Sequence, residues 1–221
     1  MTPIELLQSC ISVLLPMRCS TCGNKPASYP MSICPSCRNK ILSQNAPPAI
    51  QSKRITRILS CRSYEGLVRE CIKSFKYRGD TKLLDVFEEV IEEFIYDECP
   101  FTRNIDFIVP VPMHPSRRLK RGYNQAELIS RLVSKTMSLP SISTILLKAR
   151  DTKPQMSLDR RKRTENLKNS FVVADRLSVT GKAILLVDDI ITTGATLDMC
   201  ASQLLSAGAR SVDAFTLART L

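Results

Sequence analysis

Aromatic side chains are scarce in this sequence of 221 residues: they make up 5% of it, and tryptophan is absent. A surface that stacks successive nucleobases needs exposed aromatic rings, so this composition argues against such a surface. Long apolar runs are missing too, because stretches such as residues 183–187 are far shorter than the roughly 20 residues that a membrane-spanning helix needs. The sequence therefore predicts no membrane span.

The N-terminal residues do not read as a secretion signal, because no basic segment precedes an apolar run and no small-residue cleavage pattern follows. We therefore expect the protein in the cytoplasm. The sequence has nine cysteines, and a reducing compartment together with this odd number argues against a disulfide framework. Metal binding is the leading interpretation for any cysteines that cluster in the sequence.

The charges are unbalanced and unevenly placed. The 32 basic and 21 acidic side chains leave a net charge of +11. Residues 85–98 contain seven carboxylates and no cation, whereas residues 148–168 contain eight cations and three acids. Such separation favours a polyanionic ligand at one face, either nucleic acid or a small molecule that carries several phosphates. A solvated basic surface that only aids solubility explains the charge equally well.

The pattern of residues changes near position 45. Apolar residues at positions 4, 7, 11, 14 and 15 form one helical stripe, and a cluster of cysteines follows. Pro47 and Pro48 cannot continue a helix and favour extended backbone before them. We expect an N-terminal helix and cysteine head over residues 1–45 and a second domain over residues 46–221.

The second domain alternates helical and strand patterns. Apolar spacing predicts helices over residues 67–77, 85–97, 124–137 and 196–207. Short apolar runs predict strands over residues 105–109, 144–147, 171–173, 183–187 and 212–217. This alternation predicts an α/β fold with a mainly parallel sheet and helices on both faces.

The segment from Ile184 to Thr196 is the most informative part of the sequence. A buried strand is expected to stop at Asp188 and Asp189, and a turn of small residues then leads into a helix. Free amides at the helix start and three threonine hydroxyls suit a dianionic phosphate, while the carboxylates suit two vicinal ribose hydroxyls. The segment therefore predicts a ribose 5-phosphate site, for which the phosphate-binding residues are Thr192, Thr193, Gly194, Ala195 and Thr196.

Other interpretations of this segment are weaker. It lacks the Gly-Lys-Ser/Thr ending of a Walker A loop, and the Rossmann Gly-x-Gly-x-x-Gly is absent from the chain. Aspartate and threonine also cap helices, so either acid alone is explained by structural capping. The combined pattern of strand, two acids and threonine-glycine loop makes capping alone improbable.

This pattern resembles the signature for 5-phosphoribosyl 1-pyrophosphate in the type I phosphoribosyltransferases. The resemblance implies that Asp188 and Asp189 bind the ribose hydroxyls, that residues 192–196 bind the 5-phosphate, and that Mg²⁺ accompanies the ligand. Members that act on hypoxanthine have an aspartate at the position of Thr192, and a threonine hydroxyl is too weak a base to replace it. Salvage of purines of that kind is therefore not expected.

Further segments resemble the ComF-type phosphoribosyltransferases, bacterial proteins associated with natural competence. Besides the cysteine head and the nucleotide loop, the resemblance rests on residues 64–66, 73–79, 109–112 and 121–125. Tyr123 departs from it, where phenylalanine is common, and so does Ser157, where glycine is frequent. The resemblance implies a role in DNA uptake and transformation, with other competence proteins as partners.

Basic residues outside the nucleotide loop are candidates for binding pyrophosphate. Val111 and Pro112 are expected in a rigid loop that follows a strand, and several cations come directly after this loop. A second group of cations forms a stripe along the helix that is predicted before the strand. A basic run in residues 150–169 either closes over pyrophosphate or holds a nucleic acid backbone. Solvent exposure alone also explains such cations. The candidate cations are Lys73, Lys76, Arg117, Arg121, Arg160 and Arg163.

Two cysteine pairs lie in the N-terminal head. Cys19 and Cys22 form one Cys-x-x-Cys pair, Cys34 and Cys37 form the other, and eleven residues separate them. Four thiolates suit a tetrahedral Zn²⁺ ion, and no ligand position is left for water, so the expected zinc is structural. A redox role explains one pair alone but is the weaker explanation for two. His114, the only histidine, lies on the expected pyrophosphate loop and is assigned no catalytic role.

Two functions from different classes remain open at this point. The first is an enzyme that transfers the phosphoribosyl group and releases pyrophosphate, although no residue identifies its acceptor. The second is a module that binds single-stranded DNA in competence without transferase turnover, mainly through backbone electrostatics because aromatic residues are few.

Overall fold

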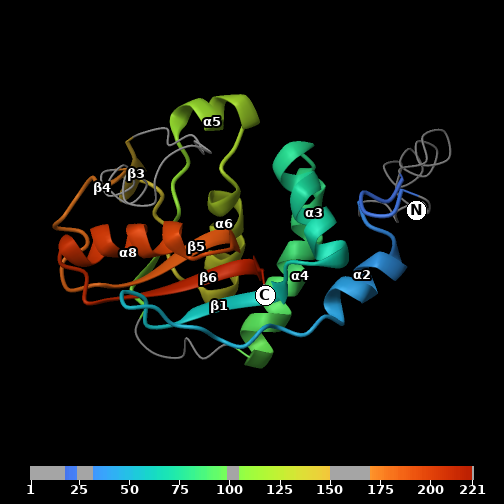
Figure 1. Ribbon diagram of the computed structural model, residues 1–221, viewed down its shortest axis with the longest axis horizontal. Helices are drawn as coiled ribbons and strands as arrows, with labels where there is room; N and C mark the ends of the chain where they lie inside the picture. The colour runs from blue at the N-terminus through green and yellow to red at the C-terminus, as the bar shows by residue number, and fades with distance from the viewer. Residues whose placement is uncertain (1–17, 24–31, 99–104, 150–169, 221) are drawn as a thin grey trace, which may run out of the picture.

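A computed structural model describes residues 18–23, 32–98, 105–149 and 170–220 of the chain (Figure 1). The expected N-terminal helix and the basic run that contains Arg160 and Arg163 lie outside the described residues. The helices are α2 (Pro35–Leu42), α3 (Gly66–Tyr77), η1 (Thr81–Leu83), α4 (Leu84–Glu98), α5 (Pro115–Arg121), α6 (Gln125–Met137) and α8 (Ala195–Ser206). The strands are β1 (Ile58–Ser63), β2 (Phe107–Pro110), β3 (Leu146–Lys148), β4 (Phe171–Val173), β5 (Ala183–Ile191) and β6 (Ser211–Arg219).

A parallel sheet of four strands forms the centre of the fold, in the order β1-β6-β5-β2. All three strand pairs in it are parallel, and Phe107 of β2 lies opposite Ile184 of β5. Residues 184–187 of β5 are fully buried, as expected for a strand in the interior of a sheet that is covered on both faces. β3 and β4 form a separate antiparallel ribbon.

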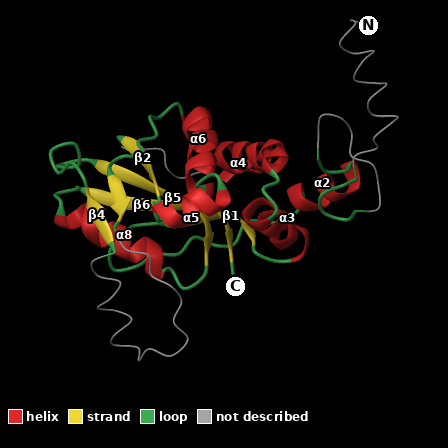
Figure 2. Cartoon of the chain, turned by 90° about the horizontal axis from the view of Figure 1, so that it is seen from above, coloured by secondary structure: helices red, strands yellow, loops and turns green. Residues whose placement is uncertain are grey.

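Helices cover both faces of the sheet, as the alternating pattern predicts. α4 and α6 lie on one side, and α8 lies on the other with the β3-β4 ribbon near it (Figure 2). Leu185 and Val187 belong to the core cluster on the α3, α4 and α6 side. Ile184 and Leu186 belong to the cluster on the α8 side. Successive residues of β5 therefore face opposite layers, as the period of a strand requires.

Most expected elements are found where the sequence predicts them, but β5 is longer. We expected a strand that stops at the two acids, whereas β5 continues through Asp188 and Asp189 to Ile191. The continuation has a physical reason, because Asp188 lies opposite Thr216 and Ile191 lies opposite Arg219 of the equally long β6. Four further elements were not expected: α2, β1, η1 and α5.

The described part of the cysteine head packs against the second domain. Cys19, Cys34, Cys37 and Ile41 belong to the same core cluster as α3 and α4. The Arg62 side chain of β1 is 4% exposed, and it donates to the carbonyls of Ile41 and Leu42 as well as to Glu93 of α4. The domain boundary at residue 45 stays a prediction. Among the described residues, no helix is both long and apolar enough to cross a bilayer.

Candidate functional site

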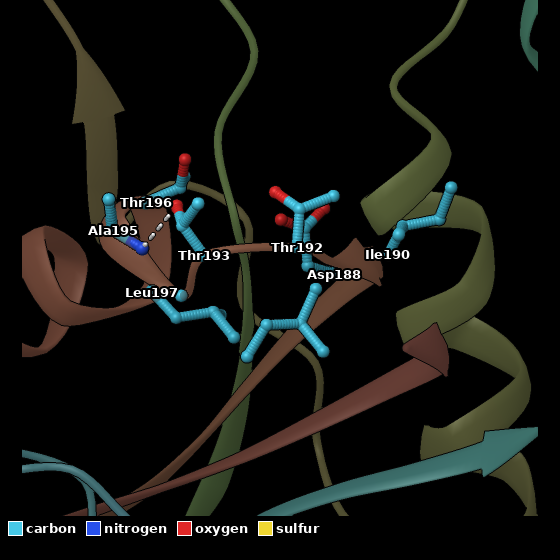
Figure 3. Close-up of a pocket in the computed structure, with 9 residues that line it drawn as sticks. Asp188, Ile190, Thr192, Thr193, Ala195, Thr196 and Leu197 are labelled. Atoms are coloured by element: carbon cyan, nitrogen blue, oxygen red, sulfur yellow. Dashed lines mark hydrogen bonds between the residues drawn. The ribbon is translucent and has the colours of Figure 1, made fainter. Parts of the chain in front are cut away.

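A small cavity lies where β5 ends and α8 begins, at the carboxyl end of the sheet. It is lined by Asp188, Ile190, Ile191 and residues 192–197. Figure 3 shows the Asp188 carboxyl and the hydroxyls of Thr192, Thr193 and Thr196 on one side of the loop, away from Leu197. The structure thus brings Asp188 together with all five residues predicted to hold a phosphate.

The loop enters α8 through a glycine in the left-handed backbone region. Gly194 caps α8 with a φ of +74°, a conformation that other residues rarely adopt, and a Cβ there would lie 3.5 Å from the Ile191 Cδ1 atom. The Ala195 N–H donates to the Thr193 hydroxyl at 3.4 Å. Thr192, Thr193 and Thr196 are exposed, so their hydroxyls are accessible to a ligand at the start of a helix.

The two acids of the motif have different partners. Asp188 lines the cavity, whereas Asp189 faces α3 and its carboxylate lies 2.9 Å from the Lys76 ammonium. The Asp189 N–H donates to the Asp188 carboxylate at 2.9 Å. Burial, reinforced by the charge of Asp189, raises the pKa of Asp188 from 3.8 to about 8. Only Asp188 is therefore directed into the cavity in this conformation.

The expected pyrophosphate loop begins next to this site. β2 is the edge strand beside β5, and the Val111 N–H donates to the Val187 carbonyl at 2.8 Å. Pro110 ends β2 at the edge of the sheet, where a missing N–H is tolerated. Asn124 joins this loop to α6: its side-chain amide donates to the Val111 carbonyl at 3.0 Å, and its oxygen accepts the Ala126 N–H.

Asn124 lies in the segment 121–125 on which the family resemblance rests, but the sequence alone assigns it no function. The sequence does indicate a helix cap at this position, because asparagine is common immediately before the first residue of a helix. The Val111 contact could not be foreseen from that signal.

The predicted cations have different surroundings. Lys73 pairs with Glu70 at 3.0 Å on the surface of α3. The Arg121 guanidinium lies 5.6 Å from the centre of the Tyr77 ring and also donates to Gln125. Arg117 lies on α5, a helix with no buried residue. Among the described cations, Lys76 is the one whose ion pair joins an acid of the nucleotide motif.

His114 has a structural position. Its ring nitrogen Nδ1 accepts the Ser116 N–H at 3.2 Å and so caps α5.

The four cysteines of the head come together. Their sulfur atoms all lie within 4.8 Å of one another, and the Cys22 and Cys34 sulfurs are 4.0 Å apart. A tetrahedral ion with bonds of about 2.3 Å holds its sulfurs roughly 4 Å apart. Burial opposes ionisation of Cys19, but N–H groups of Cys22 and Cys34 outweigh it and lower its pKa to about 6. The four thiols could therefore hold a metal ion.

Comparisons with known proteins identify the family. The phosphoribosyl transferase domain model matches residues 87–220. The chain is 28% identical to Competence protein ComFC of Bacillus subtilis over 212 residues, which cover 91% of this chain and 84% of that protein. It is 29% identical to DNA utilization protein YhgH of Salmonella typhimurium over 205 residues, which cover 92% and 84%.

Two further comparisons are shorter. Competence protein F of Haemophilus influenzae is 36% identical over 113 residues, and that match spans about half of each protein, 51% of this chain and 49% of the relative. The solved glutamine phosphoribosylpyrophosphate amidotransferase of B. subtilis, complexed with ADP and GMP, aligns with 59% of this chain and 26% of its own, at 18% identity and a TM-score of 0.40.

The family match covers more than half of the chain and includes β5, the cavity loop and β6. It agrees with the parallel sheet of the structure. The chain belongs to the phosphoribosyl transferase domain family, with the type I phosphoribosyltransferase fold, and is a ComFC-like member of that superfamily.

Proposed function

We propose that this protein binds 5-phosphoribosyl 1-pyrophosphate in the cavity between β5 and α8, within a competence-linked role. The single observation that carries the proposal is the pairing of Asp188 with the exposed threonine loop around one cavity. The 5-phosphate would accept bonds from the loop amides and hydroxyls, and Asp188 would accept from a ribose hydroxyl. The names of the relatives, which refer to competence and DNA utilization, support the biological link.

The charged groups of the ligand need counterions. Mg²⁺, when bound with the ligand, would offset part of the negative charge of the pyrophosphate. The loop that begins at Val111 and Pro112 is the place for pyrophosphate, since it follows the strand next to β5. Arg117 and Arg121 on α5 follow that loop directly, and cations there would offset the charge of the diphosphate.

We also propose that Zn²⁺ occupies the four-cysteine head. Four sulfur ligands fill a tetrahedral ion and leave no position for a reacting water, so the ion would be structural. The buried cysteines of the head belong to the same core cluster as residues of α3 and α4. Metal binding would thus stabilise the surface on which α3 rests.

Isothermal titration calorimetry tests the ligand assignment. Wild type should bind phosphoribosyl pyrophosphate only weakly without Mg²⁺ and more tightly with it, while Asp188→Asn should lose most of the binding. Asp97→Asn, which removes an exposed carboxyl of α4, is the matched control and should bind as wild type does. Equal binding by the Asp188 variant and the wild type would reject the assignment. Pyrophosphate release with candidate acceptors would then test transferase turnover separately.

A second candidate function is binding of single-stranded DNA without turnover. The observation that favours it is α5, a helix that has four cations, Arg117, Arg118, Lys120 and Arg121, and buries none of its residues. Contacts with phosphates need exposed cations of this kind and carry no sequence preference. DNA binding that persists in Asp188→Asn would separate this function from ligand binding in the cavity.

A further inference from the structure

The ion pair between Lys76 and Asp189 joins α3 to the strand that carries the nucleotide motif. The Lys76 ammonium and the Asp189 carboxylate are 2.9 Å apart, and their side chains are 19% and 10% exposed. Partial burial makes this pair stronger than an exposed one, and loss of either partner leaves the other charge poorly solvated. α3 precedes the part of the chain that matches the family model.

A second contact fixes the same end of α3. Phe75, the neighbour of Lys76, is fully buried, and its ring packs at 5.4 Å from the rings of Phe87 and Tyr123. The Tyr123 hydroxyl donates to the Phe75 carbonyl. The last turn of α3 is therefore held from two directions, by Tyr123 in front of α6 and by Asp189 on β5.

The neighbouring acid has a different environment. Asp188 faces the α8 layer and the cavity, next to the threonine loop. Its carboxylate accepts the Asp189 N–H, so a shift of the Asp189 peptide would turn the Asp188 carboxyl as well. A displacement of α3 would therefore change the orientation of the Asp188 carboxyl in the cavity through Asp189.

We propose that the two acids have separate tasks: Asp188 contacts the ligand, and Asp189 is a positioning residue that anchors α3 to β5 through Lys76. The proposal rests on the proposed function and changes the assignment of one acid within it. The family resemblance implies two equivalent ribose ligands, and the geometry points to one ligand and one anchor. Lys76 is correspondingly an anchor rather than a pyrophosphate ligand.

Binding of two ligands, phosphoribosyl pyrophosphate and ribose 5-phosphate, separates the alternatives. An anchor affects both ligands alike, so we expect Lys76→Met and Asp189→Asn each to weaken both by about tenfold, with no further loss in the double variant. Lys76→Arg should bind as wild type does, because it keeps the cation. The proposal is overturned if Lys76→Met weakens only phosphoribosyl pyrophosphate, or if it leaves both affinities unchanged while Asp189→Asn abolishes them.

The dependence of ligand binding on pH is a further test, because a purely structural role of the ion pair would not change its midpoint. The charged groups that act on the pKa of Asp188 are Asp189 on β5 and Lys76 on α3. On the α8 side, the Cys200 thiol is influenced by the charges of Asp188 and of Lys148 on β3. Asp189 raises the pKa of Asp188 and Lys76 lowers it. The midpoint of binding against pH should therefore fall in Asp189→Asn and rise in Lys76→Met. Identical midpoints in the three proteins would contradict the proposal.

Hydrogen exchange tests the anchor without any ligand, so its failure can be told from failure of the proposed function. Amides in the last turn of α3 should exchange faster in Lys76→Met and in Asp189→Asn than in wild type, and Asp188→Asn should leave them unchanged. If wild type binds neither ligand but α3 responds in this way, the proposed function fails and the anchor stands. If α3 exchanges alike in all four proteins, the anchor is rejected even where the ligands bind.

Discussion

Asn124 bonds the loop after β2 to the start of α6: its side-chain amide lies 3.0 Å from the Val111 carbonyl, while its oxygen caps the helix. The residue is 4% exposed, so both bonds are shielded from solvent. One residue thus sets the distance between the expected pyrophosphate loop and the helix that packs on β5.

Replacement of Asn124 by alanine should destabilise the fold and weaken ligand binding together. Loss of the cap and of a buried hydrogen bond should lower the free energy of unfolding by about 1–3 kcal/mol. Asn124→Ser is the comparison, because serine keeps a cap but cannot reach Val111. Urea unfolding should place it between wild type and Asn124→Ala, and equal stability of all three proteins would show that neither bond matters.

Removal of the metal should destabilise the cysteine head more than the central sheet. We expect one zinc per chain by metal analysis, and a lower unfolding temperature after chelation. Cys37→Ser should lose the zinc, whereas Cys200→Ser, which changes a buried thiol of α8 outside the cluster, should retain it. Four freely reactive head thiols in the untreated protein would contradict a filled site.

Asp188 makes the stability of the protein depend on pH. Its pKa is raised from 3.8 to about 8 by burial and by the charge of Asp189, so the native state binds a proton that the unfolded state releases. Between these two pKa values stability should fall as pH rises. The penalty is absent below pH 4 and complete above pH 8. Asp188→Asn should therefore exceed wild type in stability more at pH 8 than at pH 5, and an equal difference at both would contradict this environment.

Binding of single-stranded DNA, if it occurs through α5, should depend steeply on salt. Each phosphate contact contributes about 0.7 to the slope of log affinity against log salt, so replacing Arg117, Arg118 and Lys120 by alanine should reduce the slope by about 2. Arg121 is left intact because it packs over Tyr77. An unchanged slope in the triple variant would place the DNA contacts elsewhere.

Much of the fold can be predicted from the sequence because its signals are local. α3 (Gly66–Tyr77) begins one residue before the predicted helix and ends with it, and β4 lies over the predicted residues 171–173. β1 was missed because all six of its residues are buried, so the strand lacks polar-apolar alternation. Its polar residues Ser60 and Arg62 are stabilised by partners distant in the sequence, such as Thr216 and Glu93.

The candidate site shows the same limit. The threonine loop is visible in the sequence because strand, acids and glycine are contiguous. Lys76 belongs to a stripe with Arg69 and Lys73, and spacing cannot tell which member turns toward β5. Only Lys76 meets an acid of the motif, and this depends on how α3 packs. The contact of Asn124 with Val111 likewise depends on tertiary structure.

A crystal structure of the protein with ribose 5-phosphate tests the central claim most directly. The account predicts the phosphate within hydrogen-bond distance of the amides and hydroxyls of residues 192–196, with a ribose hydroxyl on the Asp188 carboxylate. A phosphate bound only to surface cations such as those of α5, with the loop between β5 and α8 empty, would contradict it.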